Sequence, residues 1–175
     1  ASFNNLESDM ETKMKKFTIL LCTLFLVSCS SDEAAESEIV DNAGTIERLD
    51  PRLDALIPAG ANIQKLAGGF TFTEGPVWDR RNNLLYFSDV RDNTIYSWSE
   101  DSGVRIFIQP VYAEATDHPS VGSNGLTLDS EGRLVLMEHG YRRVSRLEAN
   151  GERTPLVDNY RGNRLNSPND VAWHS

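Results

Sequence analysis

The sequence contains little cysteine, no long hydrophobic run and no basic patch. Its two cysteines, Cys22 and Cys29, both lie near the amino terminus, so most of the chain has no partners for a disulfide framework. The apolar run at 17–27 has eleven residues, whereas a helix that crosses a bilayer needs about 20. The net charge is −9, and without clustered Lys and Arg a surface cannot displace counterions from nucleic-acid phosphates. These absences argue against a disulfide-stabilised scaffold, an anchor helix and a nucleic-acid-binding protein.

Residues 14–29 have the order of a bacterial signal peptide. Lys15 and Lys16 precede the apolar run 17–27, and the following Leu-Val-Ser-Cys resembles the lipobox of bacterial lipoproteins, in which the cysteine thiol receives a lipid. We therefore predict cleavage before Cys29, a lipid anchor on that residue, and attachment to the membrane of the bacterial cell envelope. A buried helix with an incidental cysteine is the alternative.

The segments that flank the signal peptide have distinct compositions. Residues 1–13 precede a better start at Met14, so we expect them to be an upstream leader or an artefact. Residues 30–45 are acidic and small, which is the composition of a linker. We expect the folded domain at 46–175, and because the last residues form a strand-like run without a closing element, we expect the chain to be cut short there.

One sequence template occurs three times, at 74–79, 124–129 and 169–174. Each copy has a polar side-chain oxygen, then a small or turn residue, then alternating apolar positions. The copies lie 50 and 45 residues apart, which is typical of the four-stranded blades of a β-propeller. The sequence therefore predicts an all-β fold with two blades and the first strand of a third.

Strand-like runs separated by turns fill the intervals between the copies, as blades require. The clearest hairpin signal is Asn150-Gly151. Arg142, Arg143 and Arg146 form the only local basic group, and on an acidic protein we expect a solvated strand face for them. The predicted strands are 84–90, 94–100 and 104–110 in the first blade, and 133–140, 142–149 and 153–160 in the second.

The first residue of each copy is a candidate ligand for a metal ion. In a propeller the first strand of each blade borders the central channel, so Glu74, Asn124 and Asn169 should face it at one level. One carboxylate and two carboxamides supply the hard oxygen donors that Ca²⁺ accepts. Alternatively, asparagine before Gly or Asp simply makes a turn, but this explanation does not apply to Glu74.

The motifs TEGPVWD, LLYFSDV, SNGLTLDSEGRLVLMEHGYRRVSRLE and NRLNSPNDVAW together resemble the gluconolactonase, regucalcin (senescence marker protein) and luciferin-regenerating enzyme family. The resemblance runs from about residue 66 to the end and implies a six-bladed β-propeller with one divalent cation in its channel. It implies metal ligation by Glu74 and Asn169, and substrate binding by Arg164 and Asn124. His139 belongs to a motif of the lactonase branch and is a candidate general base, although a lone His beside Gly is more often a loop residue.

Three functions are compatible with these residues. The leading hypothesis is a calcium-dependent hydrolase of sugar lactones, in which the cation polarises the lactone carbonyl. A second keeps the metal site but hydrolyses organophosphates or other esters, as the related diisopropyl fluorophosphatases do. The third is a non-catalytic propeller lipoprotein that binds a carbohydrate or a protein.

Overall fold

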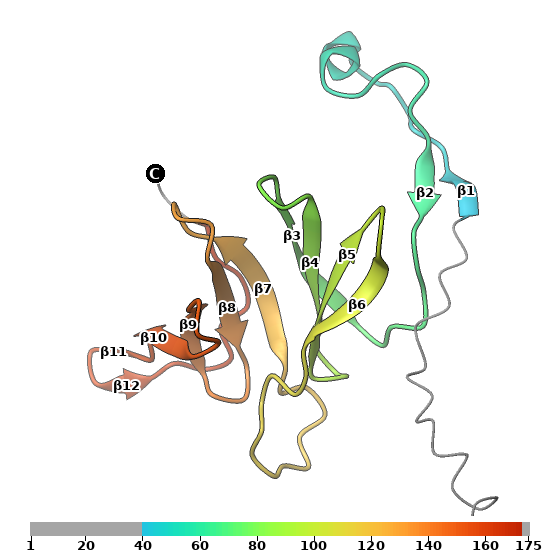
Figure 1. Ribbon diagram of the computed structural model, residues 1–175. Coiled ribbons are helices and arrows are strands. Elements are labelled where there is room, and N and C mark those ends of the chain that lie inside the picture. Colours follow the sequence, from blue (N-terminus) through green and yellow to red (C-terminus); the bar gives the residue numbers. More distant parts are fainter. Residues whose placement is uncertain (1–39, 173–175) are drawn as a thin grey trace, which may run out of the picture. The chain divides into compact units, whose positions relative to one another are not determined.

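The computed structural model describes residues 40–172, which lie within one compact unit, Ala34–Ser175. The expected leader (1–13), the expected signal peptide (14–29) with Cys29, and most of the expected linker (30–45) lie outside the described residues. The only helical element in the described part is the 3₁₀ helix η1, Pro51–Ala55 (Figure 1). No helix between residues 40 and 172 is therefore long and apolar enough to cross a membrane.

Two four-stranded antiparallel sheets form the body of the described chain (Figure 1). Each sheet has its strands in sequence order, as the blade prediction requires. This result confirms the all-β fold. Blade one consists of β3 (Thr73–Asp79), β4 (Leu84–Asp89), β5 (Thr94–Ser99) and β6 (Gly103–Ile108), and blade two of β7 (Ser123–Leu128), β8 (Leu134–Glu138), β9 (Arg143–Leu147) and β10 (Arg153–Val157).

Four short strands lie outside the blades, of which three were not expected from the sequence, whereas β11 is the end of the predicted strand 153–160, which the structure divides after Val157. β1 (Val40–Gly44) pairs with β2 (Ile63–Lys65), and β11 (Asn159–Tyr160) pairs with β12 (Asn163–Arg164). β1 falls within the stretch expected to be a linker. Val40 is 43% exposed and residues 42–44 of β1 are also exposed, so this strand has no apolar pattern from which it could have been predicted.

The tight turns contain residues that tolerate a left-handed backbone. Asn83 and Asn93 have φ values of 52° and 57°, and Gly132 and Gly151 have φ values of 85° and 84°. Asparagine and glycine adopt this region at little cost. All four residues lie in or beside turns that connect consecutive strands of a blade, and the predicted hairpin at Asn150-Gly151 is one of these turns.

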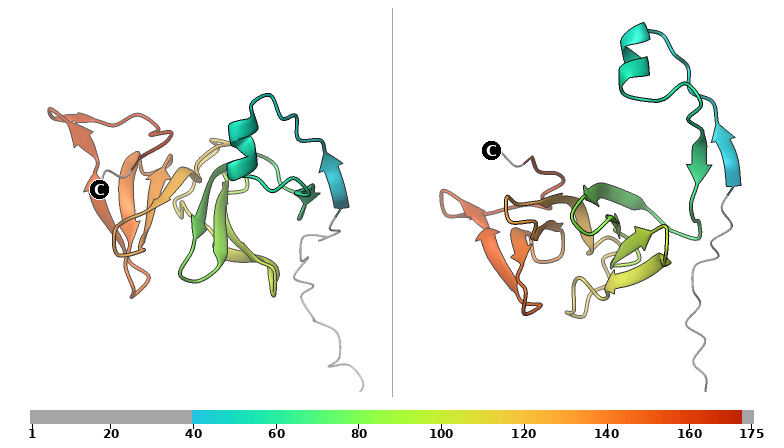
Figure 2. Two further views of the ribbon diagram at one scale, coloured as in Figure 1. Left: turned by 90° about the horizontal axis from the view of Figure 1, so that it is seen from above. Right: turned by 45° about the horizontal axis from the view of Figure 1, so that its top comes forward.

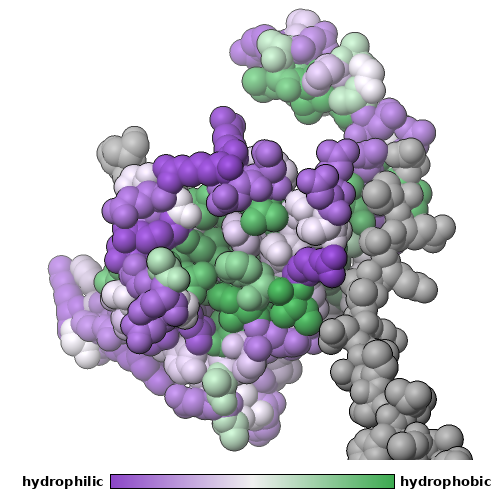
Figure 3. Space-filling model, viewed as in Figure 1, coloured by the Kyte–Doolittle hydropathy of each residue, from purple (hydrophilic) through white to green (hydrophobic). Residues whose placement is uncertain are grey.

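Both blades contribute to one hydrophobic core. Figure 2 shows two twisted sheets, and their inner strands β3 and β7 are in contact. The surface view in Figure 3 shows hydrophobic side chains gathered in the middle of the blade pair and hydrophilic ones around them. The buried core draws its side chains from strands of both blades. The buried core cluster is Tyr86, Ile95, Val111, Leu126, Leu134 and Leu136.

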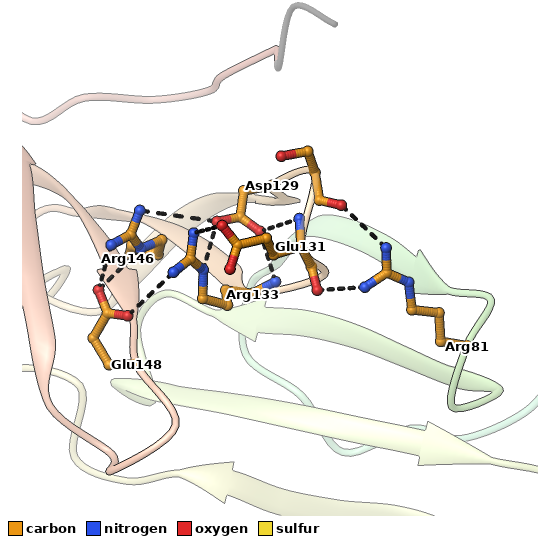
Figure 4. A network of polar contacts seen from close by, with 7 residues as sticks. Arg81, Asp129, Glu131, Arg133, Arg146 and Glu148 are labelled. Atoms are coloured by element: carbon orange, nitrogen blue, oxygen red, sulfur yellow. Dashed lines mark hydrogen bonds and ion pairs between the residues drawn. The ribbon is translucent and has the colours of Figure 1, made fainter.

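A polar network surrounds the turn between β7 and β8 (Figure 4). Asp129 is 6% exposed, and its carboxylate accepts backbone N–H groups of Glu131 and Arg133 at 2.9 Å and the Arg133 Nε–H at 2.8 Å. Burial raises the pKa of Asp129, but these hydrogen bonds outweigh it and hold the pKa below its usual range. Glu148 pairs with Arg146 at 2.7 Å and extends the network to β9.

Arg81 connects the two blades at this turn. Its guanidinium donates to the carbonyl oxygen of Ser130 at 3.1 Å and also to that of Glu131 (Figure 4). Arg81 itself lies in the turn after β3, so these bonds join equivalent turns of neighbouring blades. They add a specific polar contact to the apolar interface.

Replacement of this arginine should weaken the contact between the blades. In Arg81→Ala both hydrogen bonds are lost, and we expect the free energy of unfolding to fall by about 1 kcal/mol, since water partly replaces them. Arg80→Ala is the matched control, because Arg80 is exposed in the same turn and makes no polar contact with described residues. Equilibrium urea denaturation measures both changes, and equal losses in the two variants would contradict the assignment.

Candidate functional site

The first residues of the three copies lie close together, two of them on the inner strands β3 and β7 and the third in the segment that follows β12. The Gly125 N–H donates to the carbonyl oxygen of Asn169 at 2.8 Å, which joins β7 to the third copy. Ser88, which is paired with Glu74 across blade one, donates through its hydroxyl to the carbonyl oxygen of Asn124 at 2.8 Å. The backbones of Glu74, Asn124 and Asn169 are therefore brought to one level.

Glycine follows the polar residue because the inner strands approach backbone to backbone. A Cβ atom on Gly75 would lie 2.4 Å from the Asn124 carbonyl oxygen, and Gly75 has φ +58°. A Cβ atom on Gly125 would lie 2.5 Å from Asp170 Oδ1 and 2.8 Å from the Asn169 carbonyl oxygen. The strand register also shifts at both glycines, as at a β-bulge, which re-aims the adjacent side chain.

Asn124 and Asn169 contact one another through their side chains. The Asn124 Nδ2 donates to the Asn169 Oδ1 at 3.0 Å. Asn124 is 5% exposed, and beneath it the buried hydroxyls of Ser88 and Ser123 lie 2.8 Å apart. This bond fixes two carboxamides beside each other, one buried and one exposed.

Glu74 shares the level of the two asparagines, but its side chain has different neighbours. It is half-buried on β3 and lines a cavity of about 430 Å³ together with Lys65, Phe70, Phe87 and other residues. No direct hydrogen bond joins its carboxylate to Asn124 or Asn169 among residues 40–172. The alignment of the three predicted ligands thus comes from the backbone.

His139 directly follows β8, and its imidazole is half-buried. Burial lowers the pKa of His139, and His118 adds to this effect, whereas backbone hydrogen bonding at Ser120 and Pro168 raises the pKa. The net pKa is lowered, so the ring is neutral near pH 7. Its Nε2 is shielded from solvent and has no hydrogen-bond partner in the described part of the chain.

Arg164 lies in the exposed hairpin formed by β11 and β12, where it pairs with Asn159. It lines a cavity of about 450 Å³ with Tyr141, Asp158 and Asn159. In the described residues no hydrogen bond or ion pair connects it to Asn124 or Asn169. The structure therefore brings the two asparagines together and places Arg164 with other partners.

Two buried carboxylates beside the site were not predicted as a pair. Asp89 ends β4 and accepts the backbone N–H groups of Thr71 and Phe72 at 2.6 and 3.0 Å. Glu138 ends β8, is fully buried, and pairs with Arg143 and Arg153. The strand register makes Asp89 and Glu138 equivalent, because they lie opposite Thr73 and Ser123.

The expected solvated face of the basic group is wrong for two of its three members. Arg143 pairs with the buried Glu138, and Arg146 pairs with Glu148. Arg142 is half-exposed and donates to Asn166 Oδ1 at 3.1 Å. The pairing of Glu138 with Arg143 could have been predicted from the sequence, because a short hairpin from β8 to β9 places these two residues directly opposite each other.

The donor set at this level suits a hard cation. Between residues 40 and 172 no three His, Cys, Asp or Glu side chains gather as a metal site. The candidate oxygens instead come from one carboxylate and two carboxamides, a mixture of charged and neutral oxygens that Ca²⁺ accepts. Oxygen donors of this kind suit Ca²⁺ better than a metal that prefers nitrogen or sulfur, but in the described residues the two carboxamides bond to each other, and the Glu74 carboxylate lines a cavity to which neither asparagine contributes.

Comparison with known proteins agrees with this architecture. The family model for the SMP-30/Gluconolactonase/LRE-like region matches residues 72–175. A gluconolactonase of Zymomonas mobilis subsp. mobilis is 37% identical over 135 residues, which cover 74% of this chain and 38% of the relative. A gluconolactonase structure from Xanthomonas campestris has a TM-score of 0.64 at 31% identity and covers 78% of this chain and 43% of that one. A second structure, assigned as a gluconolactonase, has a TM-score of 0.63 at 38% identity, with 73% and 41% covered.

The repeated blades and their inner strand starts define a partial β-propeller. The chain belongs to the SMP-30/gluconolactonase/LRE-like family, as the sequence motifs predicted. It spans about two fifths of the length of the relatives that it matches.

The close approach of the inner strands can be tested at Gly125. In Gly125→Ala the added Cβ overlaps the backbone of Asn169, and we expect the free energy of unfolding to fall by about 1–3 kcal/mol. Gly60→Ala is the control, because no atom lies within 4 Å of a Cβ built there. Thermal and urea denaturation compare the variants, and a Gly125→Ala protein as stable as the control would show that the strands are not packed this closely.

Proposed function

We propose that the protein containing this chain is a calcium-dependent hydrolase that opens sugar lactones. The observation that supports this most directly is the hydrogen-bonded pair Asn124–Asn169 at the starts of the inner strands. The chain belongs to a family that includes a gluconolactonase 37% identical to it. The proposal therefore combines a family assignment with an oxygen-rich site in this chain.

The proposed cation ligands are Glu74 and Asn169. A bound divalent cation would act as a Lewis acid and polarise the lactone carbonyl. Glu74 supplies the negative charge, and Asn169, an exposed residue, offers a carboxamide oxygen that also accepts the Asn124 N–H. Arg164 and Asn124 are proposed to bind the substrate, for which guanidinium and amide N–H groups are suitable donors to sugar oxygens.

The chain's own residues also hold the site in place. Asn124 donates to Asn169 and so limits the rotation of the exposed carboxamide. The Ser88 hydroxyl is hydrogen-bonded to the Asn124 carbonyl oxygen and to the Ser123 hydroxyl. These two bonds hold the start of β7 in place. A ligand that binds here therefore meets groups whose orientation is already set, which reduces the cost of ordering them.

Activity and metal dependence test this proposal together. The intact protein should hydrolyse glucono-1,5-lactone, as measured by acid release in a pH-stat, and should lose this activity with EDTA and regain it with Ca²⁺. Asn169→Ala should lower kcat/KM by about 100-fold, the typical loss when one positioned polar group is removed. Asn163→Ala, on the exposed hairpin, should change it less than about twofold.

The outcomes separate the alternative functions. Turnover of a phosphotriester such as diisopropyl fluorophosphate without turnover of lactones would favour the esterase. Binding of a carbohydrate without turnover of either substrate would favour the non-catalytic propeller. Full lactonase activity in EDTA would remove the cation from the proposal.

We also propose that a lipid on Cys29 anchors the protein to the bacterial cell envelope. The support is the order of basic, apolar and small residues before this cysteine, which lies outside the described residues. Cells fed an alkyne-labelled fatty acid should incorporate the label into the protein, and Cys29→Ala should abolish it. Retention of label in Cys29→Ala would contradict the anchor, whereas Cys22→Ala should leave labelling unchanged.

A further inference from the structure

The segment 165–172 carries Asn169 to the candidate site without forming a strand. At the site, the Gly125 N–H donates to the Asn169 carbonyl oxygen at 2.8 Å, and the Asn124 Nδ2 donates to its Oδ1 at 3.0 Å. At the start of the segment, the Leu165 N–H donates to the carbonyl oxygen of the residue before β11 at 3.1 Å. Between these points, a side chain of blade two contacts the segment.

This side chain belongs to Arg142, in the turn between β8 and β9. Its Nη1 donates to the Asn166 Oδ1 at 3.1 Å. The backbone N–H of the half-exposed Arg142 donates to the His139 carbonyl oxygen at 3.2 Å, which closes the turn. Asn166 lies three residues before Asn169, so the arginine connects blade two to the chain just ahead of the asparagine pair.

The backbone of Arg142 has a conformation that arginine rarely adopts. Its φ value is 55°, which lies in the left-handed region, where the Cβ atom of most residues crowds the backbone. Glycine adopts this region at little cost. A strained residue of this kind persists where the surrounding structure requires it, and it points to a role for the side chain.

Blade one has an equivalent residue, Asn93. Residues 90–93 connect β4 to β5, and residues 139–142 connect β8 to β9. Asn93 and Arg142 are the last residues of these two connections, and both have positive φ values, 57° and 55°. The two side chains can therefore be compared directly.

Asn93 holds the segment that leaves blade one. Its Nδ2 donates to the Tyr112 carbonyl oxygen at 2.8 Å, and its Oδ1 accepts the Tyr112 N–H at 2.9 Å. Its carbonyl oxygen also accepts the Val111 N–H at 2.9 Å. Residues 111–112 begin the connection from blade one to β7, as residues 165–166 belong to the connection from blade two to the third copy. In both blades the side chain at this position thus holds the outgoing segment.

We propose that Arg142 is a positioning residue, which holds the segment 165–169 beside blade two and so keeps Asn169 in place for its bond with Asn124. Its importance for catalysis rests on the proposed function of Asn169. The holding contact itself does not, because it is a property of the described chain.

Hydrogen exchange of the Gly125 amide tests this proposal, since this N–H is bonded to the Asn169 carbonyl oxygen. Exchange is followed by NMR in the intact protein labelled with ¹⁵N-glycine and ¹⁵N-leucine, and Leu136 of β8, which is fully buried, is the reference for general stability. Arg142→Gly suits the backbone but removes the guanidinium. We expect exchange of Gly125 to accelerate about fivefold relative to Leu136, the effect of one lost hydrogen bond.

Further variants separate the hydrogen bond from other effects. Asn166→Ala should give the same acceleration, and the double variant with Arg142→Gly should give no more, because both changes remove one contact. Arg142→Lys keeps an N–H donor and a positive charge, and should stay within about twofold of the parent protein.

Arg161→Gly is the matched control. Arg161 is also an arginine with positive φ, 51°, but it lies in the exposed turn of the β11–β12 hairpin, so its replacement should leave the relative exchange of Gly125 unchanged. Unchanged relative exchange in Arg142→Gly, or additive effects in the double variant, would overturn the proposal. If Arg142→Gly does not fold, Asn166→Ala and Arg142→Lys still decide. The measurement needs no substrate, so failure of the proposed function leaves its result intact.

Discussion

The backbone-to-backbone approach of the inner strands is the constraint on which the rest of the structure depends. It is possible only because Gly75 and Gly125 lack a Cβ atom. Because the backbones approach so closely, the Gly125 N–H of β7 can donate to the carbonyl oxygen of Asn169. The same approach brings the side chains of Asn124 and Asn169 within hydrogen-bonding distance. The hydrophobic core between the blades and the polar site at the strand starts are thus two results of the same close packing.

Buried charge is the second constraint on this acidic protein. A buried carboxylate is costly unless hydrogen bonds or an opposite charge compensate it. Glu138 is compensated by two arginines and Asp129 by backbone N–H groups and Arg133. Arg133, Arg143 and Arg153 of blade two therefore pair with interior acids, although the net charge of the protein is −9.

The blades could be predicted from the sequence because alternation, turn residues and the spacing of the template all agree. The asparagine pair could be placed because a repeat implies equivalent positions. Arg164 could not be placed, since its exposed two-residue strand carries no hydrophobic pattern. The cavity beside Glu74 and the partial burial of His139 also depend on segments distant in sequence, which local patterns do not encode.

Asp89 and Glu138 show how two equivalent positions can transmit force differently. Asp89 holds the backbone that enters blade one, so a pulling force on that incoming segment would act on the end of β4, an interior strand of the sheet. Glu138 connects β8 to β9 and, through Arg153, to the outer strand β10, and Arg153 also donates to the Val111 carbonyl oxygen at 2.6 Å. In blade two, polar contacts thus connect three strands to one another and to the segment that follows blade one. In blade one, the equivalent carboxylate contacts only the segment that precedes the blade.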